Sequence, residues 1–230
     1  MSVCIKSLIK NVNLIVGCDI GCPYCYARNN CRRFHMTDDF SKPVFFRNKL
    51  HILDNKQPHV WFMTGLSDFT GWLPEWREEI FERMKANPQH QYVFLTKRPE
   101  RIDFETDFDN AWIGVTVTHR NELHRIADLR EHIKCRHYHV TFEPMFSPMP
   151  EDMDLQGIDW VVVGTETGKR RGKCDSKPAW VENILHQTSM RGIPTFMKED
   201  LVPIMGEENM IQEMPEVFNQ VLEEQKKWHS

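Results

Sequence analysis

The sequence predicts an α/β fold of the partial TIM barrel type, with roughly six strand–helix units, (β/α)6, and then a C-terminal strand and helix. Strand-like apolar runs alternate with amphipathic helical patterns, and this alternation implies a parallel sheet with right-handed crossovers. Several of the runs are near-continuous, as expected for strands buried on both faces. The chain has 230 residues, fewer than the ~250 that a closed eight-fold barrel usually takes.

Seven segments are predicted as strands: residues 12–16, 60–64, 92–96, 112–118, 138–142, 160–163 and 195–197. Helices are predicted near residues 28–34, 74–86, 123–133, 178–191 and 217–222, with an irregular or helical excursion at 45–53. Pro74 and Pro178 suit the first position of a helix, because the N–H that proline lacks would be unpaired there. A doubly wound open sheet is the alternative. In either fold the chemistry belongs at the C-terminal ends of the strands.

One domain is expected to span residues 1–230, with a core at 10–200 and a helical tail at 201–230. The 14 Phe, 7 Trp and 12 Met exclude a disordered chain, because they supply apolar area that offsets the ordering entropy. No apolar run approaches the ~18 residues of a membrane helix and no secretory signal pattern is present, so a cytoplasmic protein without a membrane partner is expected. The net charge of −4 indicates no global electrostatic attraction to nucleic acid, although it is compatible with a local patch. No feature of the sequence sets the oligomeric state.

A loop with three cysteines follows the first predicted strand, with the spacing Cys18-x3-Cys22-x2-Cys25. Gly17 and Gly21 allow the sharp backbone bend that brings three thiolates together. Three ligands from one loop are informative, because most clusters and structural zinc sites use four. A four-iron cluster on three thiolates leaves one iron free to chelate a small molecule. The alternative is a zinc site completed by a distant His or Cys, and the chain has 11 His.

The remaining cysteines are scattered: Cys4, Cys31, Cys135 and Cys174. They form no second paired motif, so a second cluster is not indicated. Metal or redox chemistry in a reducing compartment is therefore favoured over a disulfide framework.

The loop, with Tyr24 directly before the third cysteine, resembles that of the radical S-adenosylmethionine enzymes. The resemblance implies a [4Fe-4S] cluster on Cys18, Cys22 and Cys25, with Tyr24 beside the cofactor. It implies that S-adenosylmethionine binds the open iron through its amino and carboxylate groups. A low-potential electron donor of the flavodoxin or ferredoxin type then reduces the cluster, the C5′–S bond breaks, and a 5′-deoxyadenosyl radical abstracts hydrogen from the substrate. The protein supplies position and excludes water and oxygen.

The resemblance implies that the turn after the second predicted strand, with Gly65, Ser67 and Asp68, binds the amino group of the cofactor, although this turn departs from the usual double-glycine-and-acid form. The alternative is a strand-to-helix turn in which Ser67 or Asp68 caps the helix. On the fourth predicted strand, Thr116 and Thr118 share a face. The resemblance implies that a polar residue near the end of this strand contacts the ribose, so both are candidates. Threonine is also simply a good strand former.

Carboxylates follow the fifth and sixth predicted strands at Glu143 and Glu166. A carboxylate just past a buried strand is costly unless it faces a polar pocket, so both are candidates for catalysis, and Glu143 also for cofactor contact. Lys97 and Lys198 are catalytic candidates that supply the opposite charge. The alternative is an ion-pair network that holds the rim together. A barrel hydrolase with the two glutamates as paired acid and base is a further alternative, but it leaves the three cysteines unexplained.

Four further segments carry a second resemblance: Leu-Thr-Lys-Arg-Pro-Glu-Arg at 95–101, Trp-Ile-Gly-Val-Thr-Val at 112–117, Phe-Glu-Pro at 142–144 and Gly-Ile-Pro-Thr-Phe-Met-Lys at 192–198. Together they resemble the radical S-adenosylmethionine proteins of phages and bacteria whose reaction is unassigned. The likeness spans residues 10–200 and departs at Gly164-Thr165, where two glycines are usual, and at the loop 169–174. It supports the fold and the cofactors, and it gives no substrate.

A basic run at the sixth strand end contains Lys169, Arg170, Arg171 and Lys173. It is able to grip a phosphate at the barrel mouth, so a nucleotide or nucleic acid is one candidate substrate. A solvated loop is the alternative. We expect residues 29–59 and the C-terminal tail to take part in substrate recognition. A zinc-stabilised module that binds nucleic acid without catalysis is the alternative function.

Overall fold

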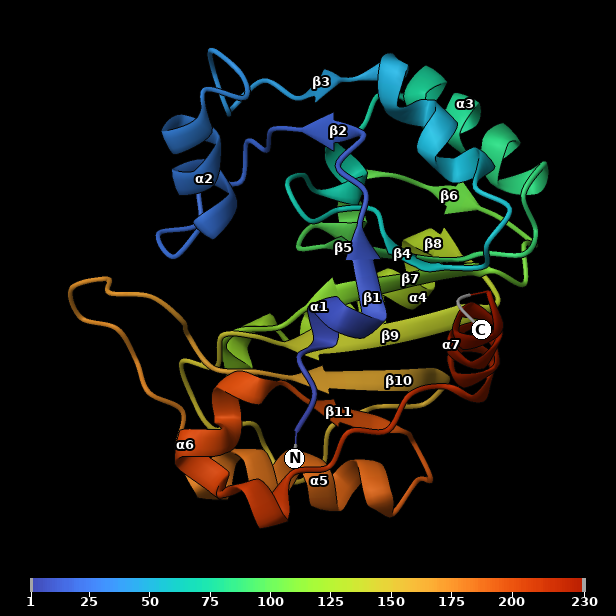
Figure 1. The fold of residues 1–230 in the computed structure, drawn as a ribbon. Helices are drawn as coiled ribbons and strands as arrows, with labels where there is room; N and C mark the ends of the chain where they lie inside the picture. Colours follow the sequence, from blue (N-terminus) through green and yellow to red (C-terminus); the bar gives the residue numbers. More distant parts are fainter. Residues whose placement is uncertain (1, 229–230) are drawn as a thin grey trace.

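The computed structural model describes residues 2–228 and is built around one seven-stranded sheet (Figure 1). Neighbouring strands in this sheet are all parallel, in the order β1-β4-β5-β7-β9-β10-β11. The strands are β1 (Ile9–Asn11), β4 (Val60–Phe62), β5 (Gln91–Thr96), β7 (Ala111–Thr116), β9 (His137–Phe142), β10 (Ile158–Val163) and β11 (Thr195–Met197). They are added in chain order with no reversal, and the sheet curls into a half-barrel. The predicted partial barrel is confirmed, and the doubly wound alternative, which needs a reversal, is wrong.

The first predicted strand, residues 12–16, is wrong in its placement. The strand that joins the main sheet is β1, which lies directly before that run, at the sheet edge. The sequence of β1 does not look like a strand, because Lys10 and Asn11 are exposed and only Ile9 is buried. The apolar run supplies β2 (Ile15–Val16), which pairs antiparallel with β3 (Val44–Phe45) in a separate ribbon. The other six predicted strands are confirmed, with β7 ending at Thr116, two residues earlier than predicted.

Helices connect the strands: α1 (Ile5–Leu8), α2 (Tyr26–Phe34), α3 (Pro74–Lys85), α4 (His124–His132), α5 (Pro178–Ser189), α6 (Val202–Met205) and α7 (Glu216–Lys227). The five predicted helices are confirmed, and Pro74 and Pro178 begin theirs as expected. The excursion at 45–53 is largely a 3-10 helix, Arg47–Asp54. A short ribbon joins β6 (Phe104–Glu105) to β8 (Ile133–Lys134). Within residues 2–228, none of the helices has both the length and the apolar character needed to cross a bilayer.

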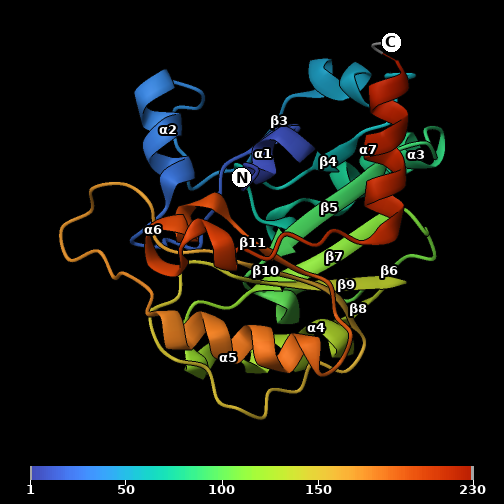
Figure 2. The ribbon, with the colours of Figure 1, turned by 60° about the horizontal axis from the view of Figure 1, so that its bottom comes forward.

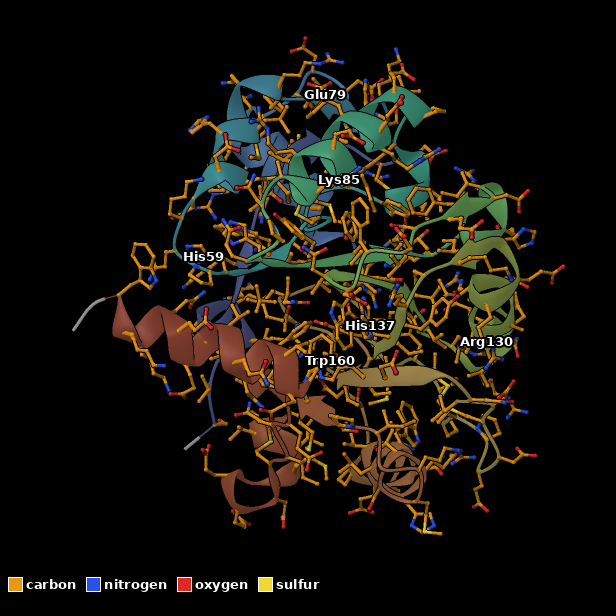
Figure 3. The ribbon with its side chains drawn as sticks, turned by 90° about the vertical axis from the view of Figure 1, so that its right-hand side faces the viewer. His59, Glu79, Lys85, Arg130, His137 and Trp160 are labelled. Carbon is orange, nitrogen blue, oxygen red and sulfur yellow. The ribbon has the colours of Figure 1, made fainter. Side chains whose placement is uncertain are left out.

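The concave face of the sheet is covered at one end only. Trp112 and Trp160 point into it, and α7 places Phe218 against both rings, with centroid distances of 4.7 and 5.5 Å. Figure 2 shows α7 crossing the strands, and Figure 3 shows Trp160 beside this helix. This apolar cluster fills the N-terminal half of the half-barrel, and the C-terminal half is left for a cavity.

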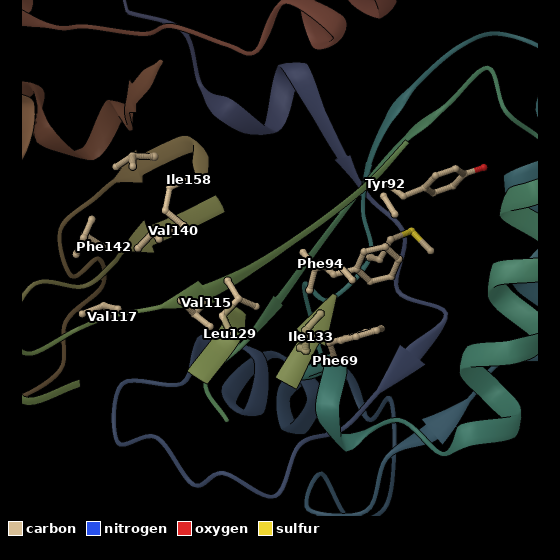
Figure 4. Packing of buried hydrophobic residues seen from close by; sticks show 14 of the residues in the cluster. Phe69, Tyr92, Phe94, Val115, Val117, Leu129, Ile133, Val140, Phe142 and Ile158 are labelled. Carbon is tan, nitrogen blue, oxygen red and sulfur yellow. The ribbon is translucent and has the colours of Figure 1, made fainter. Parts of the chain in front are cut away.

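The convex face carries the larger core. Side chains of alternate strand positions, such as Phe94, Val115 and Val140, pack with Leu129 of α4 (Figure 4), and α3 and α5 join the same cluster. Since both faces of the strands are covered, the strand sequences are near-continuous apolar runs, as the sequence pattern indicated.

Candidate cofactor site at the mouth of the half-barrel

A cavity of about 470 Å³ opens at the carboxyl ends of the parallel strands. Its walls include most of the site residues predicted from the sequence: Cys18, Cys22, Tyr24, Cys25, Gly65, Ser67, Asp68, Lys97, Thr116, Glu143, Glu166 and Lys198. Thr118 does not line it. Segments that are far apart in the chain therefore meet at one place, because parallel strands present their carboxyl ends at the same edge.

The cysteine loop turns sharply between β2 and α2. The backbone N–H of Cys18 donates to the carbonyl of Phe40 at 2.7 Å, and that of Gly17 donates to Leu66 at 2.9 Å. Gly17 has a φ of +124°, and a Cβ there would lie 2.7 Å from the Cα of Pro43, so only glycine is accommodated without strain. The bend that the sequence predicted at this glycine is confirmed.

The three thiols of this loop are free and partly buried. The Cys25 thiol sits at the N-terminus of α2 and accepts from the N–H of Arg28 at 3.3 Å. Burial raises the pKa of Cys18 to about 12, so a thiolate there requires a compensating positive charge. Metal centres supply such charge, and a coordinating thiol is deprotonated.

The three cysteines of the loop are the candidate ligands of a metal centre, and all three line the cavity. Within residues 2–228, no three His, Cys, Asp or Glu side chains are placed so that they hold one metal ion. Both the cluster and the zinc site therefore stay predictions.

Charged groups on the neighbouring strand end hold the cysteine loop. Asp19 forms ion pairs with Arg101 at 2.9 Å and with Arg98 at 3.8 Å, and Arg98 also donates to the carbonyl of Ile20 at 3.5 Å. Sequence analysis missed this role. A lone carboxylate between the first two cysteines, and two arginines after the third predicted strand, are the signal from which it could have been found.

The turn after β4 makes structural contacts. The carboxylate of Asp68 accepts from the Thr70 N–H at 3.2 Å, the Thr96 hydroxyl at 2.7 Å and the Lys97 N–H at 2.9 Å. The Ser67 hydroxyl accepts from a tryptophan N–H at 2.9 Å. The interpretation of Asp68 as a helix cap is confirmed, because it caps the short 3-10 helix Phe69–Gly71. Its binding to a cofactor stays a prediction.

Gly65 in the same turn lies against the chain on two sides. A Cβ at this position would lie 3.0 Å from the amide oxygens of both Asn11 and Asn13, and the Gly65 carbonyl accepts from the Tyr26 hydroxyl at 2.7 Å. The tyrosine therefore joins the first turn of α2 to the strand end beneath it.

The two threonines of β7 and its extension differ in their surroundings. Thr116 lines the cavity. The N–H and hydroxyl of Thr118 both donate to Glu122, at 2.7 and 2.8 Å, which commits this residue to the turn that follows. Of the two candidates for a ribose contact, only Thr116 faces the cavity.

Glu143 and Lys198 form an ion pair at the rim, and Asp200 lies 3.5 Å from the same ammonium. Burial by itself would lower the pKa of Lys198, but the charges of Glu143 and Asp200 outweigh it and raise that pKa. Burial raises the pKa of Asp200 to about 6, against the opposing effect of the lysine. Sequence analysis missed Asp200, although it lies only three residues past β11.

Glu166 is paired within its own loop. Arg170 binds both of its oxygens, at 2.5 and 2.8 Å, and the Cys174 N–H donates at 3.2 Å. The hydrogen bonds from Arg170 hold the pKa of Glu166 below its usual value, the opposite of what a general acid needs. The ion-pair interpretation is confirmed for this residue, and the hydrolase alternative is weakened.

The fold and the cavity define an α/β half-barrel protein with a cavity at the carboxyl ends of its strands. Residues 5–227 match the family described as "Protein of unknown function (DUF5131)", and the chain belongs to it. Among solved structures the chain is similar to a cysteine-to-alanine variant of spore photoproduct lyase with dinucleoside spore photoproduct. The identity is 10% and the TM-score 0.42, over 95% of this chain and 72% of that one. No curated protein sequence matches the chain.

Proposed function

We propose that the chain is a radical S-adenosylmethionine enzyme whose [4Fe-4S] cluster is held by Cys18, Cys22 and Cys25. The observation that carries the proposal is the position of these three cysteines, which line one cavity at the carboxyl ends of an all-parallel half-barrel. When bound, the cluster and S-adenosylmethionine supply the one-electron chemistry that removes a hydrogen atom from a substrate.

The chain holds the loop rigidly from two sides. Arg98 and Arg101 bind Asp19 on one side, and the Tyr26 hydroxyl binds the Gly65 carbonyl on the other. A centre with only three ligands depends on such outer contacts for its orientation.

The rim offers both a hydrogen-bond acceptor and a cation to an amino acid ligand. Glu143 is suited to accept from the N–H groups of an amine and Lys198 to pair with a carboxylate, and the two residues neutralise each other in the free protein. Asp200 keeps the lysine charged while the glutamate changes its partner. The methionyl part of S-adenosylmethionine carries the two groups that this pair requires.

Two further features support the proposal. The apolar cluster of Trp112, Trp160 and Phe218 fills the N-terminal half of the half-barrel and excludes water there. Thr116 and Lys97 add polar groups to the walls, and none of the ion pairs within residues 2–228 engages Lys97. The proposal requires a low-potential electron donor of the flavodoxin or ferredoxin type.

Anaerobic reconstitution tests this function directly. The protein is treated with iron, sulfide and thiol, and we expect about four irons per chain, as a cubane requires. With dithionite and S-adenosylmethionine, it should release 5′-deoxyadenosine or methionine. Zinc without iron would contradict the proposal and favour a zinc-stabilised binding module.

Two matched cysteine variants test the ligand assignment. Cys22→Ala should lose the cluster, whereas Cys174→Ala, which removes a thiol outside the loop, should keep it. Iron and cofactor cleavage retained in Cys22→Ala would show that the assignment is incorrect.

A further inference from the structure

Two segments flank the mouth of the cavity. One is α2, which contributes Tyr26, Ala27 and Asn30 to the walls, and the other is the loop after β10, which contributes residues 165–167. Figures 1 and 2 both show α2 and this loop projecting from the same side of the half-barrel. A molecule that enters the cavity therefore passes between them.

Both segments are basic, although the chain as a whole has a net charge of −4. The helix α2 and the loop 167–174 contain no Asp or Glu. Within residues 2–228, ion pairs engage Arg170 and Lys173 of the loop, and no ion pair engages five other cations: Arg28, Arg32, Arg33, Lys169 and Arg171. Positive charge is thus concentrated on the two segments that flank the mouth, and five of their seven cations have no ion-pair partner within residues 2–228.

Exposed aromatic rings accompany these charges. Tyr26 is 55% exposed and Phe34 is 63% exposed, one at each end of α2. The Tyr26 ring is fixed by its hydroxyl, which binds Gly65, and the guanidinium of Arg33 lies 5.3 Å from the centroid of Phe34. Leaving such rings in water is unfavourable, so their exposure beside cations indicates a ligand that presents flat apolar faces and anionic groups together.

We propose that this face, formed by α2 and the loop 167–174, binds a single strand of nucleic acid across the cavity mouth. Phosphates pair with the free arginines and lysines, and bases stack on the exposed rings, which is the combination that single strands require. A duplex is disfavoured, because its bases are stacked inside and a cavity of about 470 Å³ admits only an extruded unit. The inference deepens the proposed function by naming its substrate class, a nucleotide unit of a polymer.

Fluorescence anisotropy of a labelled single-stranded oligonucleotide tests this surface, with the full chain as purified and without S-adenosylmethionine. We expect binding that weakens with salt. The double variants Arg32→Ala/Arg33→Ala and Lys169→Ala/Arg171→Ala should each weaken binding and reduce the slope of log affinity against log salt by ~0.7 per lost phosphate contact.

A third variant distinguishes the contribution of base stacking to binding from that of charge. Phe34→Ala should weaken binding by about five-fold or more and leave the salt slope unchanged, because it removes a ring and no charge. The matched control is Lys56→Ala/Lys85→Ala, which removes two exposed cations before β4 and β5, at the opposite end of the strands (Lys85 is labelled in Figure 3). This control should bind as the unmodified chain does.

Three results would overturn the inference. The first is an equal loss of oligonucleotide affinity in the control and in the two double variants. The second is a duplex that binds as tightly as the single strand. The third is double variants that bind the oligonucleotide normally but no longer accept electrons from flavodoxin. The last would assign the face to a protein partner. Because cofactor cleavage is measured without oligonucleotide, failure of the proposed function and failure of this inference are distinguishable.

Discussion

Arg101, at the end of the segment after β5, binds Asp19 in the cysteine loop at 2.9 Å, although 81 residues of chain separate them. The contact is on the outside of the loop, and the thiols face the cavity. It fixes the position of the loop relative to the sheet, because the arginine ends the short 3-10 helix, Pro99–Arg101, that comes after β5 of the main sheet.

The first prediction concerns this pair. Asp19→Ala should change the free energy of unfolding by less than ~1 kcal/mol, because the pair is partly exposed. Loss of iron from the reconstituted protein to a chelator should nevertheless be about ten-fold faster, as for other outer-shell partners of metal ligands. Asp109→Ala breaks a similar pair with Arg136 far from the loop and serves as the control. Identical iron loss in the two variants would disprove the anchoring role.

A second prediction concerns the bend before the first cysteine. Gly17→Ala should lower the free energy of unfolding by about 1–3 kcal/mol, because the new Cβ meets the backbone of Pro43 and φ is positive. Gly71→Ala is the matched control, since nothing lies within 4 Å of a Cβ there. Urea unfolding of both variants measures the difference, and equal stabilities would contradict the backbone argument.

The third prediction is a dependence on pH through Asp200. Burial raises its pKa to about 6 in the folded chain, above the ~3.9 of an unfolded aspartate. The folded state therefore holds the proton more tightly, so this contribution to stability is present below pH ~4 and is lost as pH rises through ~6. Glu143 and Glu199 act in the same direction, and Lys198 opposes them.

Asp200→Asn should remove this loss of stability with rising pH, because asparagine does not titrate. Urea unfolding at several pH values between ~4 and ~7 should show a smaller decline of stability with pH than in the unmodified chain. Asp107→Asn, at an exposed position, should leave the pH profile unchanged. A decline of the same size in Asp200→Asn would show that this carboxyl is not the group responsible.

The fourth prediction tests whether the C-terminal tail belongs to the same domain as the half-barrel. Phe218→Ala should lower the free energy of unfolding by about 3–5 kcal/mol, because the ring is fully buried between two tryptophans. Trp228→Ala, at a 59% exposed position, should cost less than ~0.5 kcal/mol. Circular dichroism and tryptophan fluorescence should report one shared transition, and a separate transition for the tail would contradict a single domain.

Local chemistry explains which features were predictable. Pro74 and Pro178 begin helices because a missing N–H is harmless only there. Six strands were found because a strand covered on both faces must be apolar along its length. The edge strand β1 was not predicted, because Lys10 and Asn11 are exposed at the sheet edge and the apolar pattern of a buried strand is therefore missing.

The candidate site, like the fold, was predictable only in part. Proximity of the strand-end residues could be predicted, since a parallel sheet gathers its carboxyl ends at one edge. The partner of each side chain could not. Glu166 binds Arg170, four residues away, whereas Glu143 binds Lys198, 55 residues away, and nothing in the sequence distinguishes the two carboxylates.

By itself, the sequence determined the strand–helix alternation, the cysteine spacing and the glycine at the bend, because each depends on residues within a few positions of one another. Only the tertiary structure decided that the sheet curls without reversal, that Asp68 binds Thr96 and Lys97, and that Asp19 is held by Arg101. These depend on distances between remote segments, and such distances are set by the packing of the whole sheet and its helices.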